Sequence, residues 1–185
     1  MVEVPQALLA ERRRLGIDRF DEMWEGVLHM VPPPSEEHQR IGTKLLVALE
    51  PLAEAAGLLM RYETGVFDPL AESSSNYRTP DLVVFDPSCR SDRGVEGGPA
   101  LAIEIRSPGD ETLEKLDFYA RVGLAELLVV DRDDKTVRRW TLDRVTLVER
   151  LPDSDGRHRL DSLEVRLATR DQRIIVEAPT GTTVV

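Results

Sequence analysis

The sequence has few of the features that mark several large protein classes. It contains one cysteine, Cys89, so an internal disulfide and a zinc site built from cysteines are both excluded. Its apolar runs are all shorter than the roughly 20 residues that a membrane-spanning helix needs. The start of the chain does not show the apolar stretch and small-residue cleavage site of a secretory signal peptide. We therefore expect a soluble protein of the reducing cytoplasm.

Basic residues are scarce relative to acidic ones. Lys and Arg number 24 and Asp and Glu number 34, which gives a formal net charge of −10. A dedicated DNA-binding domain usually carries a basic excess, so this balance argues against one. An acidic protein can still act on nucleic acid through a local basic patch or bound metal ions. The arginines at 12–14 and 138–139 are best interpreted as solvated surface, although either group could supply such a patch.

No nucleotide-binding motif is present either. The glycine-rich stretch at 94–98 does not contain the Lys and Ser/Thr of a phosphate-binding loop, which argues against an ATPase or a kinase. The chain has 185 residues, 41% of them hydrophobic, which is enough to bury the core of one domain. We expect a single domain over 1–185, with an N-terminal helix within 1–19, a core over 20–142 and appended β-strands over 143–185.

Hydrophobic periodicity predicts the order of the elements. The best-defined element is a long helix that begins after the N-cap Ser35, keeps apolar residues at helical spacing from 41 to 53 and ends at Gly57. Shorter patterns predict helices at 5–15 and 111–122, a hairpin at 23–30, loops at 68–79 and 87–98, and strands at 58–67, 81–85, 100–106, 127–131, 136–142, 144–150, 160–167 and 173–177. Strands between two helices, with more β-structure appended, predict an α/β fold with a mixed sheet.

Two acidic residues stand within otherwise apolar strands. Side chains alternate along a strand, so Glu104 shares a face with Ala102 and lies opposite Ile103 and Ile105. Asp81 follows Pro80 and begins the second apolar strand. Burying a charge is costly unless it is paired or binds a metal. Two such carboxylates on neighbouring strands would suit one Mg²⁺ ion, which takes one or two carboxylates and keeps several waters.

Structural explanations exist for the same residues. Asp81 also suits a strand cap after Pro80, and Glu104 an ion pair with an arginine. Lys115 lies one helical turn from Glu111 and Tyr119, so a surface Glu111–Lys115 pair would account for it, at a few tenths of a kcal/mol. Taken from the residues alone, this surface pair is the preferred reading of Lys115.

Four separated blocks resemble one known family. Pro80-Asp81, the 104–108 segment Glu-Ile-Arg-Ser-Pro, the 115–123 segment that begins Lys-Leu-Asp-Phe-Tyr, and the 127–131 strand occur in the order found in the Uma-type putative restriction endonucleases. This bacterial family is a branch of the PD-(D/E)XK nuclease-like superfamily. The segments at 25–28 and 33–39 are similar to its entry hairpin and first-helix motif. The resemblance runs from about residue 20 to about residue 142.

The resemblance implies a restriction-endonuclease-like sheet and a three-residue site. Asp81 and Glu104 would ligate Mg²⁺ or Mn²⁺, and Lys115 would assist catalysis from the helix. In the wider superfamily a lysine lies two residues after the second acid, where this chain has Arg106. Arginine does not deprotonate in proteins, so Arg106 is at most a phosphate contact, and an ion-paired strand residue explains it better.

The first-helix motif adds Glu37 and His38 as further candidates. The resemblance implies that this motif comes near the site, where Glu37 would be an outer-sphere or second-metal ligand. As alternatives, Glu36 and Glu37 are ordinary acidic residues in a first helical turn, and His38 is a packed, hydrogen-bonded histidine.

The resemblance implies a metal-dependent endonuclease-like enzyme that acts on DNA. We expect a homodimer, because two sites would serve the two strands, with the C-terminal strands as the interface. One alternative is a binding module that keeps the fold without catalysis, which tight metal binding without cleavage would reveal. Another is a hydrolase of a different phosphoester, which an acidic surface would suit better.

Overall fold

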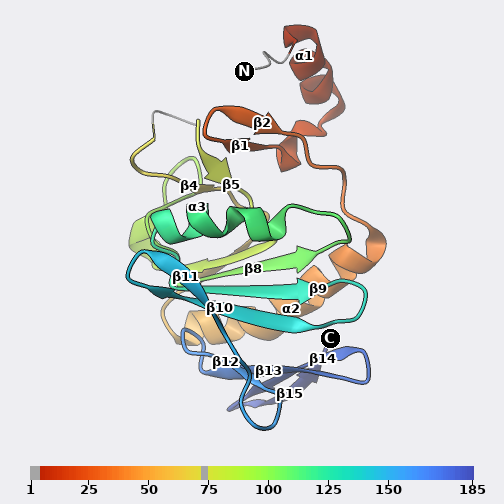
Figure 1. Ribbon diagram of the computed structural model, residues 1–185, viewed down its shortest axis with the longest axis vertical. Helices are drawn as coiled ribbons and strands as arrows, with labels where there is room; N and C mark the ends of the chain where they lie inside the picture. Colours follow the sequence, from red (N-terminus) through yellow and green to blue (C-terminus); the bar gives the residue numbers. More distant parts are fainter. Residues whose placement is uncertain (1–4, 72–74) are drawn as a thin grey trace.

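A six-stranded mixed sheet forms the centre of the computed structural model, which describes residues 5–71 and 75–185 (Figure 1). Its strand order is β11-β10-β9-β8-β6-β3. The strands are β3 (Leu59–Tyr62), β6 (Leu82–Phe85), β8 (Leu101–Arg106), β9 (Glu126–Asp131), β10 (Val137–Asp143) and β11 (Thr146–Arg150). β8 and β9 are parallel and the other neighbouring strands are antiparallel. The predicted mixed α/β architecture is confirmed.

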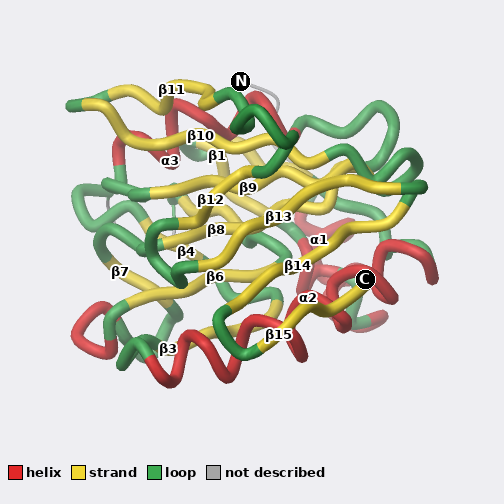
Figure 2. Tube along the Cα trace, turned by 90° about the horizontal axis from the view of Figure 1, so that it is seen from below, coloured by secondary structure: helices red, strands yellow, loops and turns green. Residues whose placement is uncertain are grey.

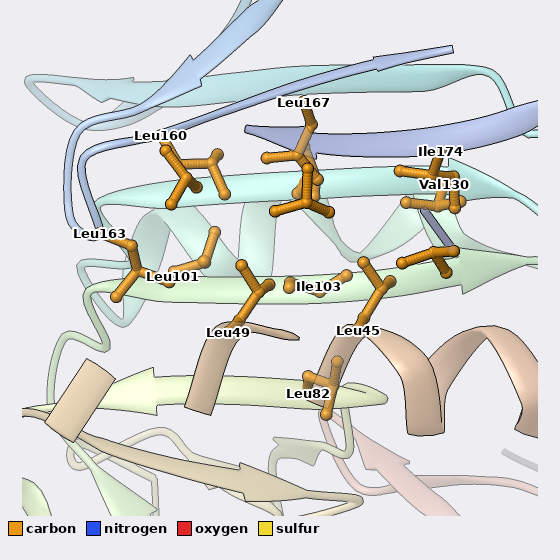
Figure 3. Packing of buried hydrophobic residues seen from close by; sticks show 14 of the residues in the cluster. Leu45, Leu49, Leu82, Leu101, Ile103, Val130, Leu160, Leu163, Leu167 and Ile174 are labelled. Atoms are coloured by element: carbon orange, nitrogen blue, oxygen red, sulfur yellow. The ribbon is translucent and has the colours of Figure 1, made fainter. Parts of the chain in front are cut away.

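The two faces of this sheet bury two separate apolar clusters. α2 (Glu36–Ala55) and the C-terminal strands cover one face, where Leu45, Ile103 and Leu167 belong to the same cluster (Figure 3). α3 (Leu116–Arg121) covers the other face, where Ala102 packs with Tyr119. Along β8, Leu101, Ile103 and Ile105 belong to the first cluster and Ala102 to the second, so the predicted alternation is confirmed.

Helix α2 begins and ends where the sequence predicts. The Ser35 hydroxyl accepts a hydrogen bond from the His38 amide and caps the first turn. At the other end, Gly57 adopts a left-handed φ of 73°, and the Leu58 amide donates back to the Ala53 carbonyl. The predicted helix and both of its ends are therefore confirmed.

The appended C-terminal strands form a four-stranded antiparallel sheet of β12 (His158–Leu160), β13 (Val165–Arg170), β14 (Arg173–Ala178) and β15 (Gly181–Val184) (Figure 2). The prediction of one strand over 160–167 is wrong, because a turn with Glu164 at φ 54° reverses the chain inside it. β15 was not predicted. Its four residues, Gly-Thr-Thr-Val, are exposed and include one large apolar side chain, so no hydrophobic pattern marks it.

The remaining strands form a third sheet, in the order β2-β1-β5-β4-β7. They are β1 (Glu22–Trp24), β2 (Val27–His29), β4 (Val66–Phe67), β5 (Tyr77–Arg78) and β7 (Val95–Glu96). The predicted hairpin at 23–30 is confirmed. The single strand at 58–67 is wrong, because Glu63 at φ 45° separates β3 from β4, and the two strands join different sheets.

Other predicted boundaries also change. The predicted loops contain β5, β7 and a 3₁₀ helix at η2 (Pro87–Cys89), while residues 72–74 of the first loop lie outside the described residues. The helix predicted over 111–122 is a 3₁₀ turn, η3 (Thr112–Lys115), followed by α3. At the N-terminus, α1 (Gln6–Leu15) leads through η1 (Asp18–Phe20) into β1 and projects from the body (Figure 1). Among the described helices, none is long and apolar enough to cross a membrane.

Candidate active site

A pocket of about 720 Å³ opens at one end of the central sheet. Its lining comes from the β1–β2 hairpin, the segment that leads into α2, the start of β6, the end of β8 and the loop and η3 turn that follow β8. Four residues singled out from the sequence line it: Asp81, Glu104, Lys115 and His38. Segments far apart in the chain therefore meet around one cavity.

Asp81 and Glu104 face this pocket from adjacent strands. β6 and β8 pair with Leu82 opposite Ile103, and continuing that register by one residue places Asp81 opposite Glu104. Residues directly opposite in an antiparallel pair point to the same face of the sheet. The Asp81 carboxylate is fixed in position because its Oδ2 accepts a hydrogen bond of 2.6 Å from the Ile105 amide.

The Glu104 carboxylate is almost fully buried, at 6% side-chain exposure. Its Oε1 accepts a hydrogen bond of 2.5 Å from the Tyr119 hydroxyl and one of 3.1 Å from Lys115 Nζ. Burial raises the pKa of Glu104 to about 7, against the opposing effect of Lys115 and with the help of the nearby Asp81 charge. A second cation near this carboxylate would therefore favour its charged form.

Lys115 reaches the site from the end of η3. Its ammonium lies 3.1 Å from Glu104 Oε1 and 2.9 Å from Glu22 Oε1, and the side chain is 12% exposed. Burial acts to lower the pKa of Lys115, but the two carboxylates outweigh it and raise the pKa above its ordinary value. Lys115 is thus a buried, protonated cation. The surface-pair alternative is contradicted, because Glu111 contacts His29 Nδ1 at 2.9 Å and Lys115 lies among other carboxylates.

His38 and Glu37, neighbours on α2, point to different surroundings. His38 Nε2 lies 2.7 Å from Asp81 Oδ1. Burial acts to lower the pKa of His38, but the hydrogen bond to Asp81 and the nearby acids raise it overall. Glu37 instead pairs with Arg40 at 2.6 Å and Lys135 at 2.7 Å, and these partners lower its pKa to about 2. The structure thus brings His38 into the pocket and gives Glu37 to an ion-pair cluster outside its lining.

Glu22 is the residue of this site that the sequence prediction missed. It is 2% exposed and lies on β1 with three hydrogen-bond donors around its carboxylate. Besides Lys115, the Thr79 amide donates to Oε1 at 2.8 Å and the Trp24 indole N–H donates to Oε2 at 2.7 Å. The available signal was an acidic residue directly before Met23 and Trp24 in the predicted hairpin. That signal does not identify Lys115, the partner of Glu22, which lies 93 positions away.

Arg106, at the position of the superfamily lysine, is not among the pocket residues. Its guanidinium lies 3.7 Å from Asp131 of β9, and its side chain is partly exposed. The interpretation of Arg106 as an ion-paired strand residue is confirmed.

The chemistry of the site suits a small divalent cation with oxygen ligands. Asp81 and Glu104 offer two carboxylates at one end of a rigid sheet, which is the number that Mg²⁺ commonly takes from protein. No group of three or more His, Cys, Asp or Glu side chains arranged to hold a metal occurs within 5–71 and 75–185. An ion here would complete its shell with water or with oxygens of the substrate, as Mg²⁺ prefers.

The pocket as a whole is acidic. Six of the described residues that line it are acids: Glu22, Glu63, Asp81, Glu104, Asp110 and Glu111. Lys115 and Arg132 are the lysine and arginine of this lining. This negative charge would repel a phosphate unless a cation compensates it. The carboxylates of Asp81 and Glu104 are suited to bind such a cation.

Comparison with known proteins identifies a matching family and a solved structure with a similar fold. The sequence profile of the Uma2 family, described as "Putative restriction endonuclease", matches residues 16–171. A search of curated proteins finds no match. Among solved structures, a putative nuclease belonging to DUF820 from Anabaena variabilis ATCC 29413 is similar, with a TM-score of 0.62 and 18% sequence identity. The match covers 78% of this chain and 83% of the other. The predicted nuclease-like fold with additional C-terminal strands is therefore confirmed.

Proposed function

The chain belongs to the Uma2 family of putative restriction endonucleases, and from that premise we propose that it is a metal-dependent endonuclease-like hydrolase of phosphodiester bonds in DNA. The observation that carries the proposal is the meeting of Asp81, Glu104 and Lys115 at one pocket. These residues come from the start of β6, from β8 and from η3. Their convergence supports a shared chemical task more strongly than any one of them alone.

Asp81 and Glu104 would hold Mg²⁺ or Mn²⁺. Such an ion, when bound, lowers the pKa of a water ligand and polarises the phosphoryl group. The Ile105 amide and His38 fix the two oxygens of Asp81, and Tyr119 fixes Oε1 of Glu104. The protein thus orients both carboxylates before any ligand arrives, which lowers the cost of reorganisation on binding.

Lys115 has a different task. An ammonium whose pKa is raised does not take a proton at neutral pH, so Lys115 is not the base. A fixed positive charge beside the carboxylates stabilises negative charge that builds up on the phosphoryl oxygens during bond cleavage. His38 serves as a positioning residue for Asp81.

Two further features belong to the proposal. We infer a homodimer, because two sites would serve two DNA strands, with the C-terminal sheet as the interface. One face of that sheet contributes to the apolar core, which leaves the other face and the β15 edge for a partner. The single Cys89 thiol suits a reducing compartment, so we propose a cytoplasmic location.

Cleavage assays on supercoiled plasmid and labelled oligonucleotides test the reaction. We expect cleavage with Mg²⁺ or Mn²⁺, none with a chelator, and losses on the order of 100-fold in Asp81→Asn and Glu104→Gln. Glu149→Gln is the matched control, because Glu149 is an exposed β11 residue outside the pocket. Chelator-resistant cleavage, or full activity in either site variant, would refute the proposal. Metal binding without cleavage of DNA or RNA would identify a non-catalytic module.

A further inference from the structure

The pocket has two chemically different walls. The carboxylates and Lys115 occupy the side formed by the central sheet and η3. The other side is largely apolar and comes from the β1–β2 hairpin and the segment after it, with Leu28, Met30, Val31 and prolines 32–34 in the lining. Met30 and Val31 are also among the exposed large hydrophobic residues of the molecule. Exposed apolar residues grouped beside a polar cavity are typical of a ligand-contacting surface.

A stack of planar side chains reaches the pocket on the same hairpin. It begins in the core, where the Arg78 guanidinium carbon lies 4.3 Å from the Phe118 ring centroid and 4.3 Å from that of Trp24. The Trp24 ring in turn lies 4.0 Å from the His29 ring, at an interplanar angle of 13°. The stack therefore runs from buried Phe118 and Arg78 to His29 at the pocket.

His29 belongs to the same face of the hairpin as Glu22. The two residues are paired directly across β1 and β2, and Trp24 shares their face two positions along β1. Because Glu22 points at Lys115, this face is turned toward the catalytic side of the pocket. His29 is held in plane by Trp24 and at its edge by Glu111, whose Oε2 lies 2.9 Å from Nδ1. The last ring of the stack is thus fixed near the carboxylates before a ligand binds.

We propose that the His29 ring and the neighbouring apolar wall bind an unpaired nucleobase, so that the substrate is DNA with a single-stranded or extruded nucleotide at the cleavage position. The inference rests on the proposed function. A phosphodiester bound at the carboxylates brings its own nucleoside against the wall of the same pocket. In a duplex the faces of each base are covered by its neighbours, and only an unstacked base offers a face to a protein ring.

The charge of the pocket supports the same conclusion. Proteins that follow a duplex use many Lys and Arg contacts to phosphates. The described lining has Lys115 and Arg132 against six acids, so it is poorly suited to a long run of phosphates. Stacking does not depend on net charge and contributes to affinity for any base.

Binding measurements separate base recognition from cleavage. Three fluorescent DNA probes of one sequence are titrated with the protein in buffer that contains Ca²⁺ in place of Mg²⁺. The probes are a single strand, a perfect duplex and a duplex with one bulged nucleotide. The variants are His29→Ala, which removes the ring, His29→Phe, which keeps a stacking ring, and Glu111→Gln, which keeps the ring and changes its edge contact. Circular dichroism melts verify that the hairpin and the rest of the fold are retained.

We expect the single strand and the bulged duplex to bind more tightly than the perfect duplex. His29→Ala should weaken both about tenfold, within the range for loss of one base–aromatic stack, while His29→Phe should stay close to the wild type. Equal affinity for the perfect duplex, or an unchanged affinity in His29→Ala, would overturn the inference. His29-dependent binding without cleavage in Mg²⁺ would refute the proposed reaction and leave the base site standing. Cleavage of perfect duplex at an equal rate in wild type and His29→Ala would refute the base site and leave the proposed reaction standing.

Discussion

Lys115 lies between two buried carboxylates, and its single charge does not balance the acids around it. Glu22 and Glu104 both contact the ammonium, and Asp81 acts on Glu104 electrostatically. A buried ion cluster is a poor source of stability, because the desolvation cost offsets much of the attraction. Burial, and after it the negative charges of Asp81 and Glu22, raises the pKa of Glu104, and a bound cation would oppose this shift. The proposed binding of a cation gives a reason for this cluster that its contribution to folding does not.

The first prediction concerns Lys115→Ala. The variant leaves Glu22 and Glu104 buried without their cation, so we expect the free energy of unfolding to fall by about 3 kcal/mol. The cleavage rate should fall on the order of 100-fold, because the fixed charge beside the phosphoryl group is lost. Urea denaturation and single-turnover cleavage measure the two effects. Arg14→Ala, which removes an exposed pair with Glu11, is the control and should change neither. An unchanged rate in Lys115→Ala would rule out a catalytic task for this lysine.

The second prediction assigns Glu22 a positioning role. Glu22→Gln keeps the shape of the side chain but weakens its hold on the Lys115 ammonium and cannot accept the Trp24 indole N–H with its amide nitrogen. We expect kcat to fall roughly 10- to 100-fold, as for other residues that orient a site group, with Mg²⁺ affinity and KM nearly unchanged. Isothermal titration with Mg²⁺ and steady-state kinetics separate these quantities. A parallel loss of Mg²⁺ affinity would make Glu22 a metal ligand instead.

At the scale of elements, the C-terminal sheet is attached to the central sheet by both apolar and polar contacts. Leu160, Leu167 and Ile174 belong to the same apolar cluster as Leu45 and Leu49 of α2 (Figure 3). Glu126 of β9 accepts hydrogen bonds from the Asp161 and Ser162 amides in the β12–β13 turn. These contacts make the appended strands part of the folded core of the chain.

The third prediction uses His158 of β12 as a reporter on this attachment. His158 is buried, its Nδ1 has no hydrogen-bond partner among residues 5–71 and 75–185, and burial lowers its pKa. The unfolded chain therefore binds the proton more tightly than the folded protein does. The stability that neutral His158 contributes is complete above about pH 6.5 and is lost as the pH falls below it. We expect the drop in Tm between pH 7.5 and pH 5 to be smaller in His158→Gln than in the wild type.

Thermal melts at several pH values, monitored by circular dichroism, measure this pH dependence of Tm. Arg14→Ala is the control, because Arg14 is exposed and arginine does not titrate between pH 5 and pH 7.5, so its replacement should leave the pH dependence of Tm close to that of the wild type. Identical pH dependence in His158→Gln and the wild type would show that His158 titrates alike in the folded and unfolded chain.

At the scale of the whole molecule, net charge shapes how the protein meets a polyanion. A net charge of −10 repels DNA at a distance, while the proposed reaction would place a phosphate at an acidic pocket. If the proposed function holds, affinity for DNA comes from bound cations and short-range contacts. This differs from the usual DNA-binding protein, in which displaced counterions dominate.

The fourth prediction follows from this charge. We expect a shallow dependence of DNA affinity on monovalent salt, with a slope of log K against log [NaCl] close to that of about two phosphate contacts, and strong dependence on divalent cation. Fluorescence anisotropy at fixed Ca²⁺ and varied NaCl measures the slope. A steep slope typical of about six or more phosphate contacts would reveal a basic surface that the pocket does not include.

Local patterns in the sequence determined the elements and the orientation of side chains within them. The alternation in β8 identified the face that Glu104 shares with Ala102, and the helical spacing with Ser35 and Gly57 identified α2 and its two ends. Such predictions succeed because each depends on neighbouring residues and on one buried face. The four blocks of resemblance identified the family and the fold.

Only the tertiary structure decided which side chains meet. It placed Glu22 against Lys115 across 93 positions, separated His38 from Glu37, and paired His29 with Glu111. It also broke the strand at 58–67 between two sheets. Contacts of this kind depend on how distant segments pack and on backbone turns such as the one at Glu63. The local hydrophobic periodicity of the sequence predicts neither of them.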